Sequence, residues 1–165
     1  MKNKLSINLE VSLVEIIISI LIFAIAGAIM LNCFVIARFT QIKANDKVVA
    51  GNIIQTNAEM IKSFQNKDEM NDYLNENFKT LKTDDTEIVY INYYDEDWAV
   101  SNENKDYFIS ITIADSDLNG LNKIQLIAEK VNPYPFDNDK VNKSIYKIET
   151  KKFFPIFEGG GRYGK

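Results

Sequence analysis

Residues 11–37 read VSLVEIIISILIFAIAGAIMLNCFVIA, and this stretch decides the fold. From Ile16 to Ala37 it contains 22 residues without a charge. An α-helix rises ~1.5 Å per residue, so these residues reach ~33 Å, enough to cross a hydrocarbon core of ~30 Å. Composition alone therefore predicts a segment that spans a membrane.

Glu15 stands at the N-terminal edge of this apolar run. A simple anchor gains nothing from a carboxylate at that position, and an ionisable group at membrane depth is costly. We therefore interpret Glu15 as a functional residue that requires a partner.

The stretch Glu10-Val11-Ser12-Leu13-Val14-Glu15, followed by the apolar run, resembles the N-terminal signal of type IV pilins and pseudopilins. Ser12–Glu15 match that signal in residue type and order. Val11 stands where the family usually has Phe, and Glu10 stands where it has the Gly that precedes the cut of the prepilin peptidase. The resemblance is close over about residues 1–40. In the rest of the chain it extends only to the order of the predicted helices and strands.

The resemblance implies a leader, residues 1–10, that is cleaved between Glu10 and Val11, with methylation of the new Val11 terminus and use of Glu15 in assembly. It further implies a minor subunit of a pilus, secretion or DNA-uptake filament. Its implied partners are other pilin subunits, the prepilin peptidase, the assembly platform and the membrane. The resemblance also implies that the N-terminus lies on the cytoplasmic side of the cytoplasmic membrane and the domain outside. Charge does not decide the orientation, because basic residues flank the helix on both sides.

Two other interpretations compete with this one. The first is a single-pass membrane protein whose outer domain binds a ligand or partner and never polymerises. The second is a cleaved signal peptide, for which Ala24-Ile25-Ala26 supplies a small-residue site. The second is disfavoured because the apolar run between Glu15 and that cleavage site, residues 16–23, is very short. Cleavage there would also leave residues 27–37 as an exposed apolar end.

The composition narrows the function classes. The chain has 165 residues, a net charge of −4 and a pI near 5.0, so nucleic-acid binding is not favoured. It has no His and one Cys, Cys33, which excludes His/Cys metal sites, a Cys–His nucleophile and an intrachain disulfide. Cys33 is expected to be a buried thiol within the apolar helix. We expect neither an enzyme nor a cofactor.

The helical pattern continues beyond the apolar run, which predicts one helix over residues 11–64. Apolar residues recur there at helical spacing and predict a single stripe that covers a sheet: Phe39, Ile42, Val49, Ile53, Met60 and Phe64. A second short helix within residues 65–86 is predicted from Met70, Leu74, Phe78 and Leu81.

From Glu87 onward the apolar period changes to two, which is typical of strands. We predict strands at residues 88–94, 107–114, 123–131 and 144–154, with a short return at residues 98–100. Short connections between successive strands favour an antiparallel meander. Residues 115–122, with Gly120, have the composition of a turn, and residues 132–142 that of a loop.

Two clusters were considered as sites. Asp115, Asp117 and Asn119 alternate before Gly120, but the spacing does not fit a Ca²⁺ loop of the EF-hand type, so a plain turn is favoured. The second cluster is aromatic and consists of Tyr90, Tyr93, Tyr94 and Trp98. These residues fit either the core of a sheet, which is favoured, or a partner-binding surface.

The predicted fold class is α+β, with a long N-terminal helix packed on a small antiparallel sheet of about four strands. The predicted division is a leader at residues 1–10, a transmembrane and assembly segment at 11–37, an extracytoplasmic domain at 38–158 and a flexible tail at 159–165.

Overall fold

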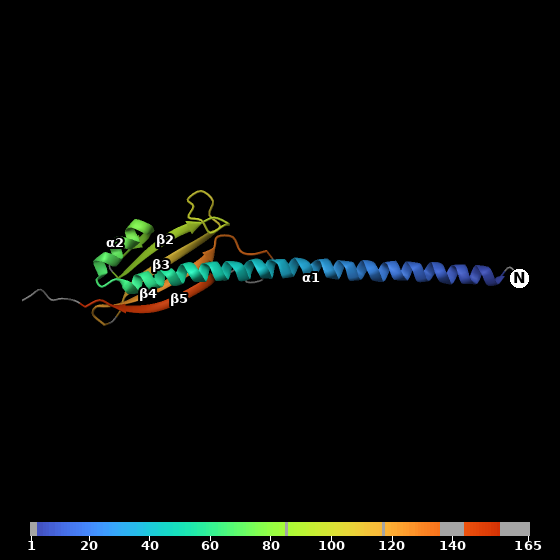
Figure 1. Ribbon diagram of the computed structural model, residues 1–165, viewed down its shortest axis with the longest axis horizontal. Coiled ribbons are helices and arrows are strands. Elements are labelled where there is room, and N and C mark those ends of the chain that lie inside the picture. The colour runs from blue at the N-terminus through green and yellow to red at the C-terminus, as the bar shows by residue number, and fades with distance from the viewer. Residues whose placement is uncertain (1–2, 85, 117, 136–143, 156–165) are drawn as a thin grey trace, which may run out of the picture. The chain divides into compact units, whose positions relative to one another are not determined.

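The structure is a computed structural model that describes residues 3–84, 86–116, 118–135 and 144–155, with side chains from Ser12 onward. Its elements follow one another as α1 (Asn3–Ser63), α2 (Lys67–Asn77), β1 (Lys79–Thr83), β2 (Glu87–Tyr94), β3 (Tyr107–Asp115), β4 (Leu121–Lys130) and β5 (Ser144–Phe153) (Figure 1). The chain divides into two compact units, Met1–Lys43 and Ala44–Lys165. Helix α1 contributes to both units. The predicted tail at residues 159–165 lies outside the described residues.

Helix α1 begins earlier than the sequence pattern indicated. It starts at Asn3, so the described part of the predicted leader is helical. No Pro or Gly occurs before Gly27, and therefore nothing in the sequence stops the helix from extending toward the N-terminus. The helix ends at Ser63, close to the predicted end.

The sheet is an antiparallel meander in the order β1-β2-β3-β4-β5. The predicted strands of residues 88–94, 107–114, 123–131 and 144–154 are confirmed as β2, β3, β4 and β5 within a residue or two at each end. The sheet has five strands, one more than expected. The return strand predicted at residues 98–100 is wrong, since only an isolated bridge joins Tyr94 to Val100.

The additional strand, β1, lies at the edge of the sheet and is exposed along its whole length. Its sequence, KTLKT, offers no alternation of apolar residues, so only its pairing with β2 reveals it. Leu81 belongs to β1 and is 63% exposed. The prediction that Leu81 is part of the second helix is therefore wrong. Lysines and the register shift between Thr80 and Lys82 are features that keep a free edge from pairing with another chain.

Helix α2 forms where the sequence predicts it. The side chain of Asn66 accepts a hydrogen bond from the backbone N–H of Glu69 and caps the first turn. Met70 and Leu74 are buried, and Phe78 is buried just beyond the last turn. The short helix therefore adds its apolar stripe to the core.

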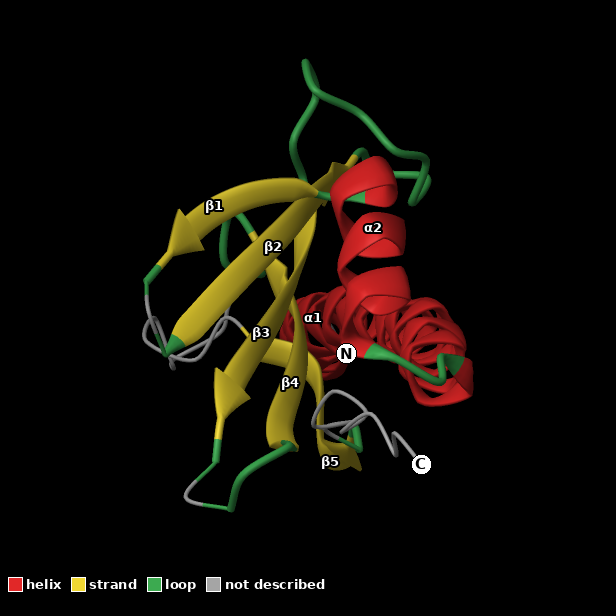
Figure 2. Cartoon of the chain, turned by 90° about the vertical axis from the view of Figure 1, so that its left-hand side faces the viewer, coloured by secondary structure: helices red, strands yellow, loops and turns green. Residues whose placement is uncertain are grey.

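The core of the domain lies between the sheet and the two helices, which cover the same face of it (Figure 2). On β3, Tyr107, Ile109, Ile111 and Ile113 are buried while the residues between them are half-buried, as the alternation predicted. The domain is therefore α+β, with a long N-terminal helix packed on an antiparallel sheet.

The buried face of α1 differs from the predicted stripe. The buried residues in this part of the helix are Asp46, Ala50, Gly51, Ile54, Ala58 and Ile61, whereas Ile42 and Met60 are exposed and Val49 and Ile53 are half-buried. The observed face combines two isoleucines that the prediction left out, Ile54 and Ile61, with small residues that let the helix backbone approach the sheet. A Cβ added at Gly51 would meet the ring of Tyr146 on β5 at 3.6 Å.

The turn between β3 and β4 depends on Gly120. This residue has φ of +82°, in the region that favours glycine. A Cβ at this position would lie 2.7 Å from the carbonyl oxygen of Phe154. The backbone N–H of Phe154 donates to the carbonyl of Gly120 at 2.8 Å, so the turn and the end of β5 pack directly on each other.

Candidate functional site

The first candidate site is the surface of α1 within the unit Met1–Lys43. Its large apolar side chains project from every side of the helix, and Phe23, Met30 and Phe34 are each more than 70% exposed. Among the described residues, α1 is the one helix that is long and apolar enough to cross a membrane. A single chain leaves this surface uncovered, so it requires lipid or other helices around it.

Glu15 lies on this exposed surface at its N-terminal edge, as the sequence indicated. Its backbone carbonyl accepts a hydrogen bond from the hydroxyl of Ser19, at 2.8 Å. Glu10 and Val11 lie in the helical run, but their side chains are outside the described ones. The backbone geometry places the three residues in one continuous helix.

Two small residues mark the middle of the same surface. A Cβ added at Gly27 would meet nothing within 4 Å, so another helix has room to approach closely there. Cys33 is exposed in the single chain, in contrast to the buried thiol that was predicted. The prediction assumed surroundings of lipid or neighbouring helices, which one chain does not supply to its own helix.

The second candidate site is a buried carboxylate, Asp46, on the part of α1 that belongs to the domain. Asp46 is only 4% exposed. Its Oδ2 accepts hydrogen bonds from the hydroxyls of Tyr107, at 2.9 Å, and Tyr134, at 2.6 Å, and its Oδ1 accepts a longer one from the indole N–H of Trp98, at 3.4 Å. The donors come from the start of β3, from the segment after β4 and from the segment after β2.

Aromatic stacking and a cation complete this cluster. The ring of Trp98 stacks on that of Tyr107 with centroids 4.1 Å apart and an angle of 15°. The ammonium group of Lys130 lies 3.9 Å from the ring centre of Tyr107 and 5.0 Å from that of Tyr134. We name Asp46, Trp98, Tyr107, Lys130 and Tyr134 the Asp46 cluster.

The Asp46 cluster shifts the titration of one of its own members. Burial raises the pKa of Tyr107 far above its ordinary value of 10, and the hydrogen bond to Asp46 raises it further. The neutral hydroxyl is therefore retained at any physiological pH. Hydrogen bonds from neutral donors on three separate segments to one buried carboxylate fix the geometry of those segments.

Trp98 lies in a turn with a strained backbone, and this turn places its indole against Asp46. Its φ is +62°, which is rare for a residue with a Cβ. The carboxylate of Asp95 accepts hydrogen bonds from the backbone N–H groups of Asp97, at 3.1 Å, and Ala99, at 2.9 Å, which holds the turn. The prediction of a core position is confirmed for Tyr90 and Tyr94, which are buried, and for Trp98, which packs against the core. It is wrong for Tyr93, which is half-buried on the opposite face of the sheet, next to Phe108.

The sequence reasoning missed Asp46. A carboxylate in a helix is ordinarily solvated, and its donors lie 52, 61 and 88 residues away in the sequence. One signal was available: Asp46 precedes Ala50, Ile54 and Ala58 at steps of four, in phase with the buried face.

The described residues hold no group of three or more His, Cys, Asp and Glu side chains arranged for a metal ion. Asp115, considered above for calcium, pairs with Lys67 on α2 at 3.0 Å, and Asp117 lies outside the described residues.

Comparisons with known proteins identify no relative of this chain. No family model matches it, and neither a curated protein nor a solved structure does so. The architecture, a long apolar N-terminal helix packed on a five-stranded antiparallel sheet, is pilin-like.

Proposed function

We propose that this chain is a minor pilin or pseudopilin, a structural subunit assembled through α1 into a filament of a pilus, secretion or DNA-uptake system. The observation that carries the proposal is the surface of residues 16–37, which is charge-free and exposed on every side, with Glu15 at its edge. The pilin-like architecture supports it. The proposal includes no catalytic activity, cofactor or nucleic-acid partner for this subunit.

Assembly would proceed from the cytoplasmic membrane, with the N-terminus inside and the domain outside. A prepilin peptidase would remove residues 1–10, leaving the amine of Val11 in the same apolar layer as Glu15. An unpaired charge is unfavourable in an apolar layer. Pairing Glu15 with the Val11 amine of a neighbouring subunit would offset the desolvation cost of both groups. Glu15 would then set the register of docking without contributing to the fold of the domain.

The test replaces Glu15. We expect Glu15→Ala to leave expression, membrane insertion and domain folding unchanged and to abolish incorporation into sheared filaments, with Glu15→Gln less severe. Removing one partner of a desolvated charge pair costs about 3–5 kcal/mol, which is enough to exclude the subunit. Ser19→Ala, one turn away, is the matched control and should incorporate normally. Normal incorporation of Glu15→Ala would overturn the pairing mechanism.

A second candidate is a single-pass membrane protein whose domain binds a partner outside and does not polymerise. The observation that favours it is Glu10 at the position where the family has Gly. The mass of the protein from its native host separates the two: a chain that begins at Val11 supports the pilin, and recovery only of the chain that begins at Met1 supports the anchor.

A further inference from the structure

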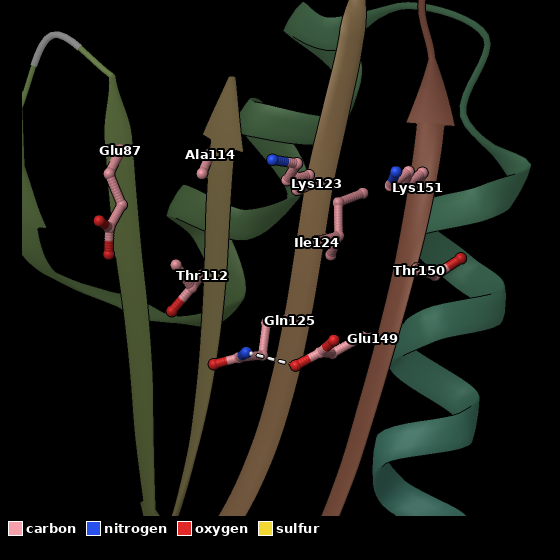
Figure 3. Close-up of a pocket in the computed structure, with 9 residues that line it drawn as sticks. All are labelled: Glu87, Thr112, Ala114, Lys123, Ile124, Gln125, Glu149, Thr150 and Lys151. Atoms are coloured by element: carbon pink, nitrogen blue, oxygen red, sulfur yellow. Dashed lines mark hydrogen bonds between the residues drawn. The ribbon is translucent and has the colours of Figure 1, made fainter. Parts of the chain in front are cut away.

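The face of the sheet turned away from α2 carries an open pocket with a volume of about 550 Å³ (Figure 2). The carboxylates of Glu87 and Glu149 line it beside the ammonium groups of Lys123 and Lys151 (Figure 3). Its charges are therefore balanced, and the pocket selects no ligand of one charge. A polar group without a partner lies instead in the apolar segment of α1.

Asn32 carries this group, a carboxamide within the charge-free run of α1. Other polar side chains of α1 bond to their own helix. The hydroxyl of Ser19 donates to the backbone carbonyl of Glu15, and the amide of Asn57 donates to that of Ile53, each at 2.8 Å. The side chain of Asn32 forms no hydrogen bond with any of the residues that the structure describes.

The depth of Asn32 makes a missing partner costly once α1 crosses a membrane. Asn32 precedes Arg38, the first charged residue after the apolar run, by six residues, which is ~9 Å along a helix. A side chain as short as that of Asn does not bridge this distance to the headgroups. A carboxamide without a partner is unfavourable in hydrocarbon, so Asn32 requires a donor and an acceptor from another helix.

Asn32 also belongs to a row of residues at steps of three and four, the spacing of the contact face between two helices of a coiled coil. Ala28, one turn before Asn32, leaves room for the backbone of a partner helix. Cys33 and Glu15 lie outside this row, because each is turned about 100° from Asn32 around the helix. We name the row the Asn32 seam, and it consists of Ile18, Leu21, Ile25, Ala28, Asn32 and Val35.

We propose that two copies of this chain pair in the membrane through the Asn32 seam, with their two Asn32 carboxamides hydrogen-bonded to each other. A carboxamide has donors and an acceptor in one group, so it is complementary to a copy of itself. Copies inserted in the same orientation hold Asn32 at the same depth, and a parallel pair therefore aligns the two amides. A single Asn in such a seam fixes the register and favours two strands.

This pair goes beyond the proposed function, because it requires neither the removal of residues 1–10 nor the pairing of Glu15. A helix of different sequence would have to supply its own polar group at the depth of Asn32. A second copy supplies one without any further requirement, which is why the observations favour it as the partner.

The experiment uses the full chain, purified and reconstituted alone in phosphatidylcholine vesicles at high dilution in lipid. The unchanged chain has one thiol, Cys33, which lies outside the seam. In a chain with Cys33→Ser, either Ala28→Cys or Val35→Cys places the one thiol within it. Oxidation with copper phenanthroline should link the seam thiols as disulfide dimers, and should link Cys33 only at the level of random collision.

Substitution of Asn32 tests the amide itself. Asn32→Leu should weaken the association of copies about 3- to 30-fold, the range expected for one hydrogen bond between helices in a membrane. The linked fraction of the Ala28→Cys chain, measured as it is diluted in lipid, gives this factor. Asn32→Gln retains an amide and should keep most of the dimer.

The matched control combines Asn32→Leu with Met30→Asn. It keeps one amide in the spanning segment but places it outside the seam, so the seam links should remain weakened. Unchanged emission of Trp98 confirms that the domain of each variant is folded.

Equal linking of Cys33 and the seam thiols, unchanged association of Asn32→Leu, or restoration by Met30→Asn would overturn the proposal. Absence of seam links in the chain reconstituted alone would do so too, and would assign Asn32 to a helix of another protein. If Glu15→Ala blocks incorporation into filaments while the seam thiols fail to link, the filament function stands and this pair falls. The reverse result keeps the pair and removes the pairing of Glu15.

Discussion

Asp46 joins three parts of the chain that are distant in sequence, and its removal has a predictable cost. Asp46→Ala leaves the hydroxyls of Tyr107 and Tyr134 and the indole N–H of Trp98 without their acceptor. An unsatisfied buried donor costs about 1–3 kcal/mol, so we expect a loss of that size or more in the free energy of unfolding. Urea denaturation measures the loss.

The chain contains one tryptophan, so intrinsic tryptophan fluorescence reports on the Asp46 cluster directly. Asp46→Ala should shift the emission of Trp98 in the native state as well as lower the stability. Asp68→Ala, an exposed carboxylate on α2, is the control and should change neither. A loss below half of a kcal/mol for Asp46→Ala, with unchanged emission, would show that water replaces the carboxylate.

Tyr107 predicts a dependence of stability on alkaline pH. Its folded pKa lies above the unfolded value of 10, so above pH 10 the unfolded chain loses a proton that the folded chain keeps. Stability from this group is therefore complete below pH 10 and is lost as the pH rises beyond it.

Tyr107→Phe should be less stable at pH 7, because the hydrogen bond to Asp46 is gone. It should also show a shallower decline in stability above pH 10 than the unchanged chain, measured by urea denaturation across that range. Tyr93→Phe, which replaces a half-buried tyrosine on the opposite face of the sheet, should retain the full slope. Equal slopes for both variants would contradict the assignment to Tyr107.

At the scale of elements, the two faces of α1 offer a direct comparison. Ile54 is fully buried against the sheet, whereas Ile53, next to it, is half-buried. Ile54→Ala should cost about 2–5 kcal/mol of unfolding free energy, as is usual for truncation in a core, and Ile53→Ala clearly less. Ile111→Ala, at a fully buried site on β3, should match Ile54→Ala. An equal or greater loss at Ile53 would place the predicted stripe, and not the observed one, against the sheet.

The elements show why part of the fold follows from sequence and part does not. β2 is rich in β-branched and aromatic residues, and β3 places an apolar residue at every second position. Patterns of this kind allowed the strands β2 to β5 and their order to be predicted. β1 has no apolar period and exists because β2 offers it a free edge. The face of α1 was misjudged because alanine and glycine give a weak apolar signal, although their small size is what brings the helix onto the sheet.

The candidate sites divide in the same way. Glu15 was found because a charge next to a long apolar run stands out in the sequence itself. Asp46 depends on contacts across the fold, which sequence spacing does not reveal. Contacts of this kind follow only once the sheet register is known.

At the scale of the whole molecule, the boundary between the units Met1–Lys43 and Ala44–Lys165 separates two kinds of surface. Up to Lys43 the large apolar side chains of α1 are exposed, and beyond Ala44 the helix buries one face in the core of the domain. A chain shortened to residues 44–165 therefore keeps every residue of that core. We expect it to be soluble without detergent and to unfold in one cooperative transition.

The same shortened chain separates folding from assembly. Its unfolding free energy should respond to Ile54→Ala and Asp46→Ala as that of the full chain does, because neither residue needs the apolar segment. Its membrane association should be lost, because residues 16–37 supply the apolar surface that lipid would cover. Circular dichroism, urea denaturation and flotation with vesicles measure these properties. Aggregation of the shortened chain, or retention of the full membrane affinity, would mean that the domain and the apolar segment depend on each other.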